Sequence, residues 1–148
     1  MRYLVDTNVV LRWAQADSPE HAACSEAVDR LLETGHDPCI CAQVMIEFWV
    51  VATRPVEVNG FGLSSDDAAA RLADLLEVLT RLPEPADIAD RWSELVLDSK
   101  AMGKQAHDTR LAALMLAHGV THLLTLNPTD FSRYEGITPV TPAEVLAS

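Results

Sequence analysis

The sequence predicts one α/β domain over residues 1–148, built on a mostly parallel sheet that helices cover on both faces. Short apolar runs rich in strand-forming residues alternate along the chain with segments whose apolar residues recur at helical spacing. Strands that alternate with helices form parallel sheets, because each crossover lays a helix against one face. The chain has 148 residues and a hydrophobic content of 49%, which is enough for the core of one domain.

The first half of the chain carries clear helix and turn signals. Ser18, Pro19 and Glu20 supply a cap residue, a proline for the first helical position and an acid for the first turn. Pro55 ends a later helix, because proline disfavours helical backbone in the residue before it. The turn-rich segment 55–63 is expected to form a flexible flap. The expected elements are strands over 3–5 and 38–41 and helices over 18–35 and 42–53.

The second half continues the alternation. Ser64 or Ser65 is expected to cap a helix that runs to about residue 79, and Gly119 to terminate a later one. A helix between them should turn Ile88, Trp92 and Leu95 inward. The remaining expected elements are helices over 106–118 and 142–146, an edge strand over 81–85 and strands over 120–126 and 138–141.

Composition and charge exclude several classes of protein. The net charge of −11 argues against binding of nucleic acid through a broad basic surface, although it leaves room for an enzyme that acts on nucleic acid through metal ions. No apolar run is long enough to cross a bilayer, and the first residues lack a secretory signal, so no membrane association is expected. Cys24, Cys39 and Cys41 are expected to be buried thiols in a reducing cytoplasm rather than a disulfide framework or a zinc site.

Asp6 directly follows the first strand. A charge placed next to a buried strand costs free energy unless it has a partner. In open α/β sheets, ligands bind just beyond the carboxyl ends of the strands. Asp6 therefore marks a candidate site, with Thr7 and Asn8 forming a polar turn into the next segment. The alternative is a carboxylate that only caps the following helix.

Glu47 interrupts an apolar helix. Its neighbours at helical spacing are Val44, Val50 and Val51, so a solvated edge for the carboxylate is hard to find. Because buried charges are paired or bind metal, a sequestered functional carboxylate is favoured over a surface charge.

Two further acids lie near the ends of later elements. Asp108 falls at the start of an expected helix, where the helix dipole favours an ionised carboxylate. Asp130 ends a turn that follows a strand, and Asn127 or Asp130 is expected to face the crevice beside Asp6, with the hydroxyl of Thr125 close by. Capping and ordinary turn chemistry are the alternatives for these residues.

The four acids lie, in chain order, at a strand end, inside a helix, at a helix start and in a turn. Oxygen-rich sites of this kind suit Mg²⁺ or Mn²⁺. Without a cation the carboxylates would repel one another and raise at least one pKa. We therefore expect a divalent-metal site formed by Asp6, Glu47, Asp108 and Asp130.

Four short motifs occur in a fixed order: L-V-D-T-N at 4–8, E-F at 47–48, H-D-T-R-L-A-A at 107–113 and L-L-T-L-N-P-T-D-F at 123–131. With these motifs, nearly the whole chain resembles the PIN-domain ribonucleases, and among them the VapC-like toxins of type II toxin–antitoxin systems. Cys41 departs from the pattern, which usually has Ser at this position.

The resemblance implies a PIN-like three-layer α/β/α fold with a five-stranded sheet. It also implies that Asp6, Glu47, Asp108 and Asp130 form the acidic site, that Asp6 and Asp108 are metal ligands, and that Asn127 holds a place where some relatives carry the fourth acid. The expected activity is Mg²⁺- or Mn²⁺-dependent cleavage of RNA by a cytoplasmic endoribonuclease. The expected partners are a cognate antitoxin and a second copy of the chain.

The residues leave two alternatives and one further candidate contact. A receiver-type signalling domain also places acids around Mg²⁺, but it needs an acceptor aspartate at the end of a middle strand, and the middle strand is expected to end at Cys41. The other alternative is a catalytically inactive binding module. Arg110, near a site acid in sequence, is a candidate phosphate contact, whereas Arg12 is expected to be a surface arginine.

Overall fold

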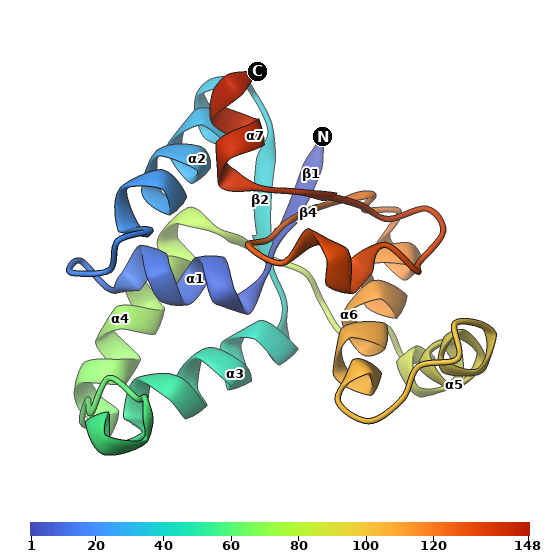
Figure 1. Cartoon of the computed structure of the whole chain (residues 1–148), viewed down its shortest axis with the longest axis horizontal. Coiled ribbons are helices and arrows are strands. Elements are labelled where there is room, and N and C mark those ends of the chain that lie inside the picture. Colours follow the sequence, from blue (N-terminus) through green and yellow to red (C-terminus); the bar gives the residue numbers. More distant parts are fainter.

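The computed structural model describes all 148 residues and contains a five-stranded sheet in which every pairing is parallel (Figure 1). The strand order is β3-β2-β1-β4-β5, so β1 is the central strand. The strands are β1 (Arg2–Val5), β2 (Asp37–Ile40), β3 (Thr80–Arg81), β4 (His122–Leu124) and β5 (Thr138–Val140).

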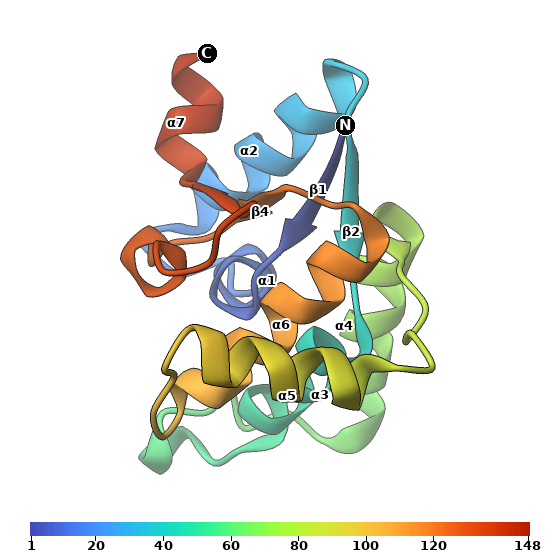
Figure 2. The ribbon, with the colours of Figure 1, turned by 90° about the vertical axis from the view of Figure 1, so that its right-hand side faces the viewer.

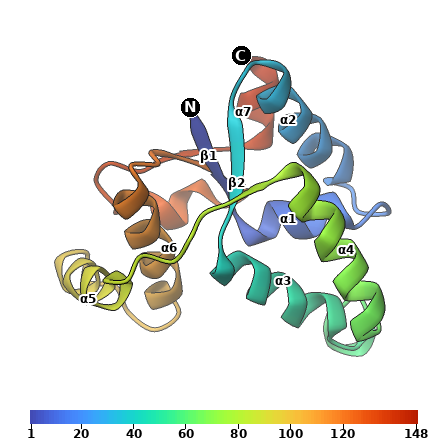
Figure 3. The ribbon, with the colours of Figure 1, turned by 180° about the vertical axis from the view of Figure 1, so that it is seen from behind.

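Helices cover both faces of this sheet, which gives the expected three-layer α/β/α arrangement. Figures 1 and 3 show α1, α2 and α4 on one side of the strands and α5 and α6 on the other. Figure 2 shows both chain termini at the same end of the molecule. None of the helices has the length and apolar character that a bilayer span requires. The helices are α1 (Thr7–Ala14), α2 (His21–Glu33), α3 (Ala42–Thr53), η1 (Val56–Val58), α4 (Ser65–Val78), α5 (Ile88–Asp98), α6 (Gln105–His118), η2 (Pro128–Phe131) and α7 (Pro142–Ala147).

Most element boundaries follow local signals in the sequence. Ser64 caps α4 by accepting a hydrogen bond from Asp67 N, and Gly119 ends α6 in the left-handed conformation, with a φ of 67°. Helix α3 has the expected bounds. The strand expected over 81–85 is instead the two-residue β3 at the sheet edge, because Pro83 and Pro85 have no N–H with which to extend the ladder.

The start of α2 was predicted wrongly. Ser18 does not cap this helix, which begins three residues later at His21. The Ser18 hydroxyl instead donates to the Glu20 carboxylate at 2.8 Å and accepts from Glu20 N at 3.3 Å. Such local side-chain bonds offer the backbone an alternative to the helix.

The segment expected to be a flap folds back on α3. Backbone N–H groups of Phe61, Gly62 and Leu63 donate to carbonyls of Val51, Arg54 and Ala52 at 2.9–3.0 Å. Gly60 allows this close return, because a Cβ there would lie 1.9 Å from the Arg54 carbonyl oxygen. The loop is therefore an ordered extension of α3.

Helix α3 is apolar on its outer face as well as its inner one. Phe48 is fully buried in the core, whereas Ile46 is 64% exposed and Val50 is 52% exposed. The prediction that this helix has no solvated edge was therefore wrong, because apolar residues occupy that edge. A surface helix that is hydrophobic all round normally packs against something further.

We expect Phe48→Ala to lower the free energy of unfolding by about 3–5 kcal/mol, because it leaves a cavity in the core. On the same helix, the matched variant Ile46→Ala should change it by no more than about 0.5 kcal/mol in protein diluted to the monomer, because Ile46 faces solvent there. Urea unfolding of both variants measures the difference. Equal losses would contradict the orientation of α3.

Candidate active site

Asp6 lies at the end of the central strand, where β1 passes into α1. One of its oxygens, Oδ1, accepts from Thr7 N at 2.8 Å, so Asp6 caps α1. Its second oxygen, Oδ2, accepts from the hydroxyl of Thr125 at 2.8 Å. The capping role and the site role considered from the sequence therefore belong to the same carboxylate.

Thr125 ties the end of β1 to the end of β4. This buried hydroxyl donates to Asp6 and accepts from Asn8 Nδ2 at 3.4 Å and from Asn127 N at 3.1 Å. Asn8 Oδ1 in turn accepts from Leu126 N at 3.1 Å. Asn8 and Thr125 therefore fix the two strand ends to each other, and Asn127 contributes its backbone while its side chain is exposed.

Glu47 projects from α3 and is partly buried. Its Oε2 accepts from the Thr7 hydroxyl at 3.2 Å, and its Oε1 accepts from Gln43 Nε2 at 3.0 Å. Neutral donors from α1 and α3 thus hold both oxygens, and no basic side chain pairs with this carboxylate.

Asp108 lies in the first turn of α6, and Asp130 lies in η2. Burial raises the pKa of Asp108 above its ordinary value, and the negative charges of Asp130 and Glu47 raise it further. The four expected acids therefore reach one region from four separate elements.

Asp6 has the most perturbed carboxyl of this group. Burial raises the pKa of Asp6 to about 6, the charges of Asp108 and Glu47 add to the rise, and hydrogen bonds from Thr125 and Thr7 oppose it. The four side chains share one electrostatic field. No three Asp, Glu, His or Cys side chains, however, are close enough to hold an ion by themselves.

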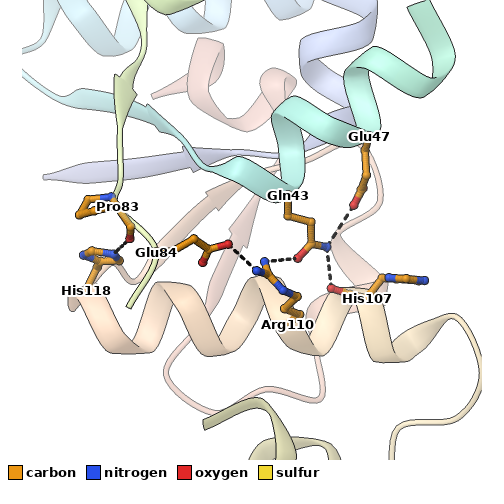
Figure 4. A network of polar contacts seen from close by, with 7 residues as sticks. All are labelled: Gln43, Glu47, Pro83, Glu84, His107, Arg110 and His118. Carbon is orange, nitrogen blue, oxygen red and sulfur yellow. Dashed lines mark hydrogen bonds and ion pairs between the residues drawn. The ribbon is translucent and has the colours of Figure 1, made fainter. Parts of the chain in front are cut away.

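A cavity of about 600 Å³ opens between α3 and the start of α6, beside two of the acids. Figure 4 shows Gln43 and Glu47 on α3 facing His107 and Arg110 on α6. The α3 side of the cavity carries one acid, and the α6 side carries one acid together with basic residues. Its lining consists of Gln43, Ile46, Glu47, Lys104, His107, Asp108 and Arg110.

The donor set fits a hydrated divalent cation. Carboxylate oxygens are the preferred ligands of Mg²⁺ and Mn²⁺, and Mg²⁺ usually keeps several waters and takes only one or two carboxylates. Burial raises the pKa values of Asp6 and Asp108 most, and a cation among these acids would offset the repulsion that adds to the rise. Spacing that is too wide for direct three-ligand coordination is compatible with an ion that retains its water.

The basic residues near the site differ in whether their side chains already have polar partners. Both terminal nitrogens of Arg110 are occupied, one by Glu84 and one by Gln43 Oε1. Arg12 bonds to Gln15, and His107 is exposed at the cavity. The side chain of Lys104 lines the cavity and forms no ion pair.

Two residues of the site were not identified from the sequence. Lys104 is one of only two lysines in the chain and lies four residues before Asp108, which is the signal that would have marked it. Gln43 lies four residues before Glu47 in an otherwise apolar helix, so it shares a helix face with that acid.

Comparison with known proteins places this geometry in a wider context. The PIN-domain family model matches residues 3–137. A search of curated protein sequences found no match. The solved structures described below are less than 25% identical to this chain, so they establish the shared fold alone.

Three of these solved structures illustrate the likeness. A chain of VapBC2 from Rickettsia felis, bound to a DNA fragment from its promoter, has a TM-score of 0.71 at 18% identity over 95% of this chain and 98% of its own. A chain of a toxin–antitoxin complex from Klebsiella pneumoniae has a TM-score of 0.65 at 22% identity, over 95% of this chain and 97% of its own. VapC20 from Mycobacterium tuberculosis, described as a sarcin–ricin loop cleaving toxin, has a TM-score of 0.58 at 19% identity, over 82% of this chain and 86% of its own.

The raised pKa of Asp6 predicts a pH-dependent cost of folding in metal-free protein. The folded state holds the proton up to about pH 6, whereas the ordinary carboxyl pKa is 3.8, so stability is lost as the pH rises through the folded value. Between pH 4.5 and pH 8 this loss amounts to about 2 kcal/mol. We expect Asp6→Asn to remove it.

Urea unfolding of wild type and Asp6→Asn in the presence of a chelator measures this difference. The free energy of unfolding of the wild type should fall relative to that of the variant as the pH rises. If the free energies of unfolding of the two proteins changed in parallel with pH, ionisation of Asp6 would not destabilise the folded state.

Proposed function

Because this chain belongs to the PIN-domain family, we propose that it is a metal-dependent endoribonuclease and the toxin of a toxin–antitoxin pair. The observation that carries the proposal is the convergence of Asp6, Glu47, Asp108 and Asp130 on one region, where burial and mutual charge raise the pKa values of Asp6 and Asp108. A site selected for stability would have paired these acids with basic side chains.

The proposed roles follow from the positions of the acids. Asp6 and Asp108 hold the main ion, and Glu47 and Asp130 hold a second ion or orient water as a base, with Asn127 as the alternative to Asp130. When bound, Mg²⁺ or Mn²⁺ supplies charge stabilisation at the scissile phosphate and lowers the pKa of a bound water.

The neighbours of the acids act as positioning groups. Thr7, Thr125 and Gln43 donate to the carboxylates without neutralising them. This arrangement keeps the acids ionised for a cation once one is present, and holds their oxygens in place before it arrives.

An RNA substrate suits the cavity better than the surface as a whole. At a net charge of −11 the protein repels RNA at long range, although salt screens this repulsion beyond about 8 Å. At the cavity, Lys104 and His107 lie beside Glu47 and Asp108. We assign Lys104 to a phosphate next to the cleaved bond, because its ammonium has no carboxylate partner.

The receiver alternative loses its support. The family match over residues 3–137 places the chain in the PIN-domain family instead. The sequence argument against the receiver was wrong, because the central strand is β1, which Asp6 follows, rather than the strand that precedes Cys41. The inactive binding module is an outcome of the activity test below.

The proposed partners are a cognate antitoxin and a second copy of the chain. The matched structures include chains from toxin–antitoxin complexes. The exposed apolar edge of α3 at Ile46 and Val50 supports burial against a second copy. The free, buried thiols of Cys24, Cys39 and Cys41 suit the cytoplasm.

We expect Asp108→Asn to abolish Mg²⁺-dependent RNA cleavage and to weaken the stabilisation of the protein by Mg²⁺. In the wild type, binding to the folded state alone should raise the free energy of unfolding by about 2.7 kcal/mol at one hundred times the dissociation constant. Cleavage is measured on a labelled RNA pool, and stabilisation is measured by melting with and without Mg²⁺.

Asp90→Asn is the matched control, because Asp90 is the acid in the first turn of the neighbouring helix α5. This control should retain both properties. Full activity in Asp108→Asn would show that Asp108 is not required for cleavage and is not a site residue. A wild type that neither cleaves RNA nor is stabilised by Mg²⁺ would support the inactive module instead.

We expect Val50→Glu to convert a dimer into a monomer, because it places a charge in the proposed apolar contact. Light scattering after size exclusion measures the mass. Leu32→Glu on α2, which is also an exposed apolar position, should leave the dimer intact. A dimer that survives Val50→Glu would exclude α3 as the contact.

A further inference from the structure

Gln43 connects the two helices that carry Glu47 and Asp108. Its side chain is only 9% exposed, and its amide nitrogen donates to Glu47 Oε1 at 3.0 Å and to the carbonyl oxygen of His107 at 2.8 Å (Figure 4). His107 directly precedes Asp108 in the first turn of α6. One amide group therefore touches one site carboxylate and the backbone that carries another.

The orientation of this amide has a single solution. A guanidinium can only donate, so the group facing Arg110 Nη1, at 3.2 Å, must be the Gln43 oxygen. The nitrogen then faces two acceptors, Glu47 and the His107 carbonyl. Turning the amide over would put a donor against Arg110 and an oxygen against each acceptor, which loses all three hydrogen bonds.

Arg110 is itself held from a third segment. Its other terminal nitrogen pairs with the carboxylate of Glu84, in the connection between β3 and α5. The result is a continuous chain of contacts from Glu84 through Arg110 and Gln43 to Glu47 (Figure 4). With both terminal nitrogens engaged, Arg110 is better suited to fixing Gln43 than to binding a phosphate.

We propose that Gln43 is a positioning residue that sets the separation of Glu47 and Asp108, and that Arg110, oriented by Glu84, fixes the direction of its amide. This inference rests on the proposed function, because it treats Glu47 and Asp108 as metal ligands. It assigns Arg110 a role inside the protein instead of the phosphate contact considered from the sequence.

Charge alone and positioning predict opposite effects of losing Arg110. Removing a positive charge near an acidic site strengthens the binding of a cation if only Coulomb attraction matters. If Arg110 positions Gln43, its loss frees the amide and weakens the binding. Partners outside the ligand set typically change metal affinity by about 10–100-fold.

Calorimetric titration with Mn²⁺ alone tests the proposal. Arg110→Met and Gln43→Leu should each weaken Mn²⁺ binding by about tenfold or more, and the double variant should be no weaker than Gln43→Leu, because Arg110 acts through Gln43. Arg110→Lys should resemble Arg110→Met, because one ammonium does not reproduce the fork that reaches both Gln43 and Glu84.

Arg91→Met is the matched control, because Arg91 forms an exposed ion pair with Asp87 on α5. It should leave Mn²⁺ affinity unchanged. If burial of Gln43 makes Gln43→Leu unstable, the partly exposed Arg110 variants still decide the question. In the wild type, the side-chain amide resonances of Gln43 should also shift on addition of Mg²⁺.

The outcomes separate this inference from the proposed function. Unchanged or tighter Mn²⁺ binding by Arg110→Met, or additive losses in the double variant, would overturn the positioning role while leaving RNA cleavage by the wild type intact. If the wild type binds Mn²⁺ but does not cut RNA, and Arg110→Met binds Mn²⁺ more weakly than the wild type, only the nuclease assignment is overturned.

Discussion

The burial of neighbouring carboxylates is the constraint on which the arrangement of this molecule depends. The end of β1, the interior of α3 and the first turn of α6 each bring an acid toward the same place. Burial, with a further contribution from the neighbouring negative charges, raises the pKa values of Asp6 and Asp108, which reflects the free-energy cost of keeping them ionised. The surrounding groups reduce this cost without removing the charge. Thr7, Thr125 and Gln43 are neutral donors, and none of the four acids has a basic partner. Neutral solvation of this kind leaves a net negative potential, which is the condition that attracts a cation.

Parallel topology explains why acids so far apart in sequence meet. With β1 in the centre, its carboxyl end lies next to the ends of β2 and β4, and the elements that follow all three strands begin at the same edge. The polar residues after β1 and β4 use this proximity, since Asn8 and Thr125 bind across the gap between the strands. The same edge also gives α3 and α6 their facing positions, which Gln43 then sets.

Local signals predicted the fold class and the bounds of α3. The four acids were chosen because they lie at a strand end, inside an apolar helix, at a helix start and in a turn. Local signals also failed at two places where partners are near or absent. The Ser18 hydroxyl bonds to Glu20 instead of capping α2, and the apolar composition of α3 did not reveal that Ile46 and Val50 face solvent. Other features depend on distant partners. Gln43 is the clearest case, because its meaning comes from His107 and Arg110, more than sixty residues later.

The contacts of the central strand join residues that are far apart in the sequence, so they form late during synthesis of the chain. Asp6 is made well before its partner, because the hydroxyl that it binds belongs to Thr125, 119 residues further on. A nascent chain on the ribosome that ends before β4 therefore lacks one neighbour of β1 and one side of the acidic pocket. The acidic pocket is therefore completed only after β4 and Thr125 have been synthesised.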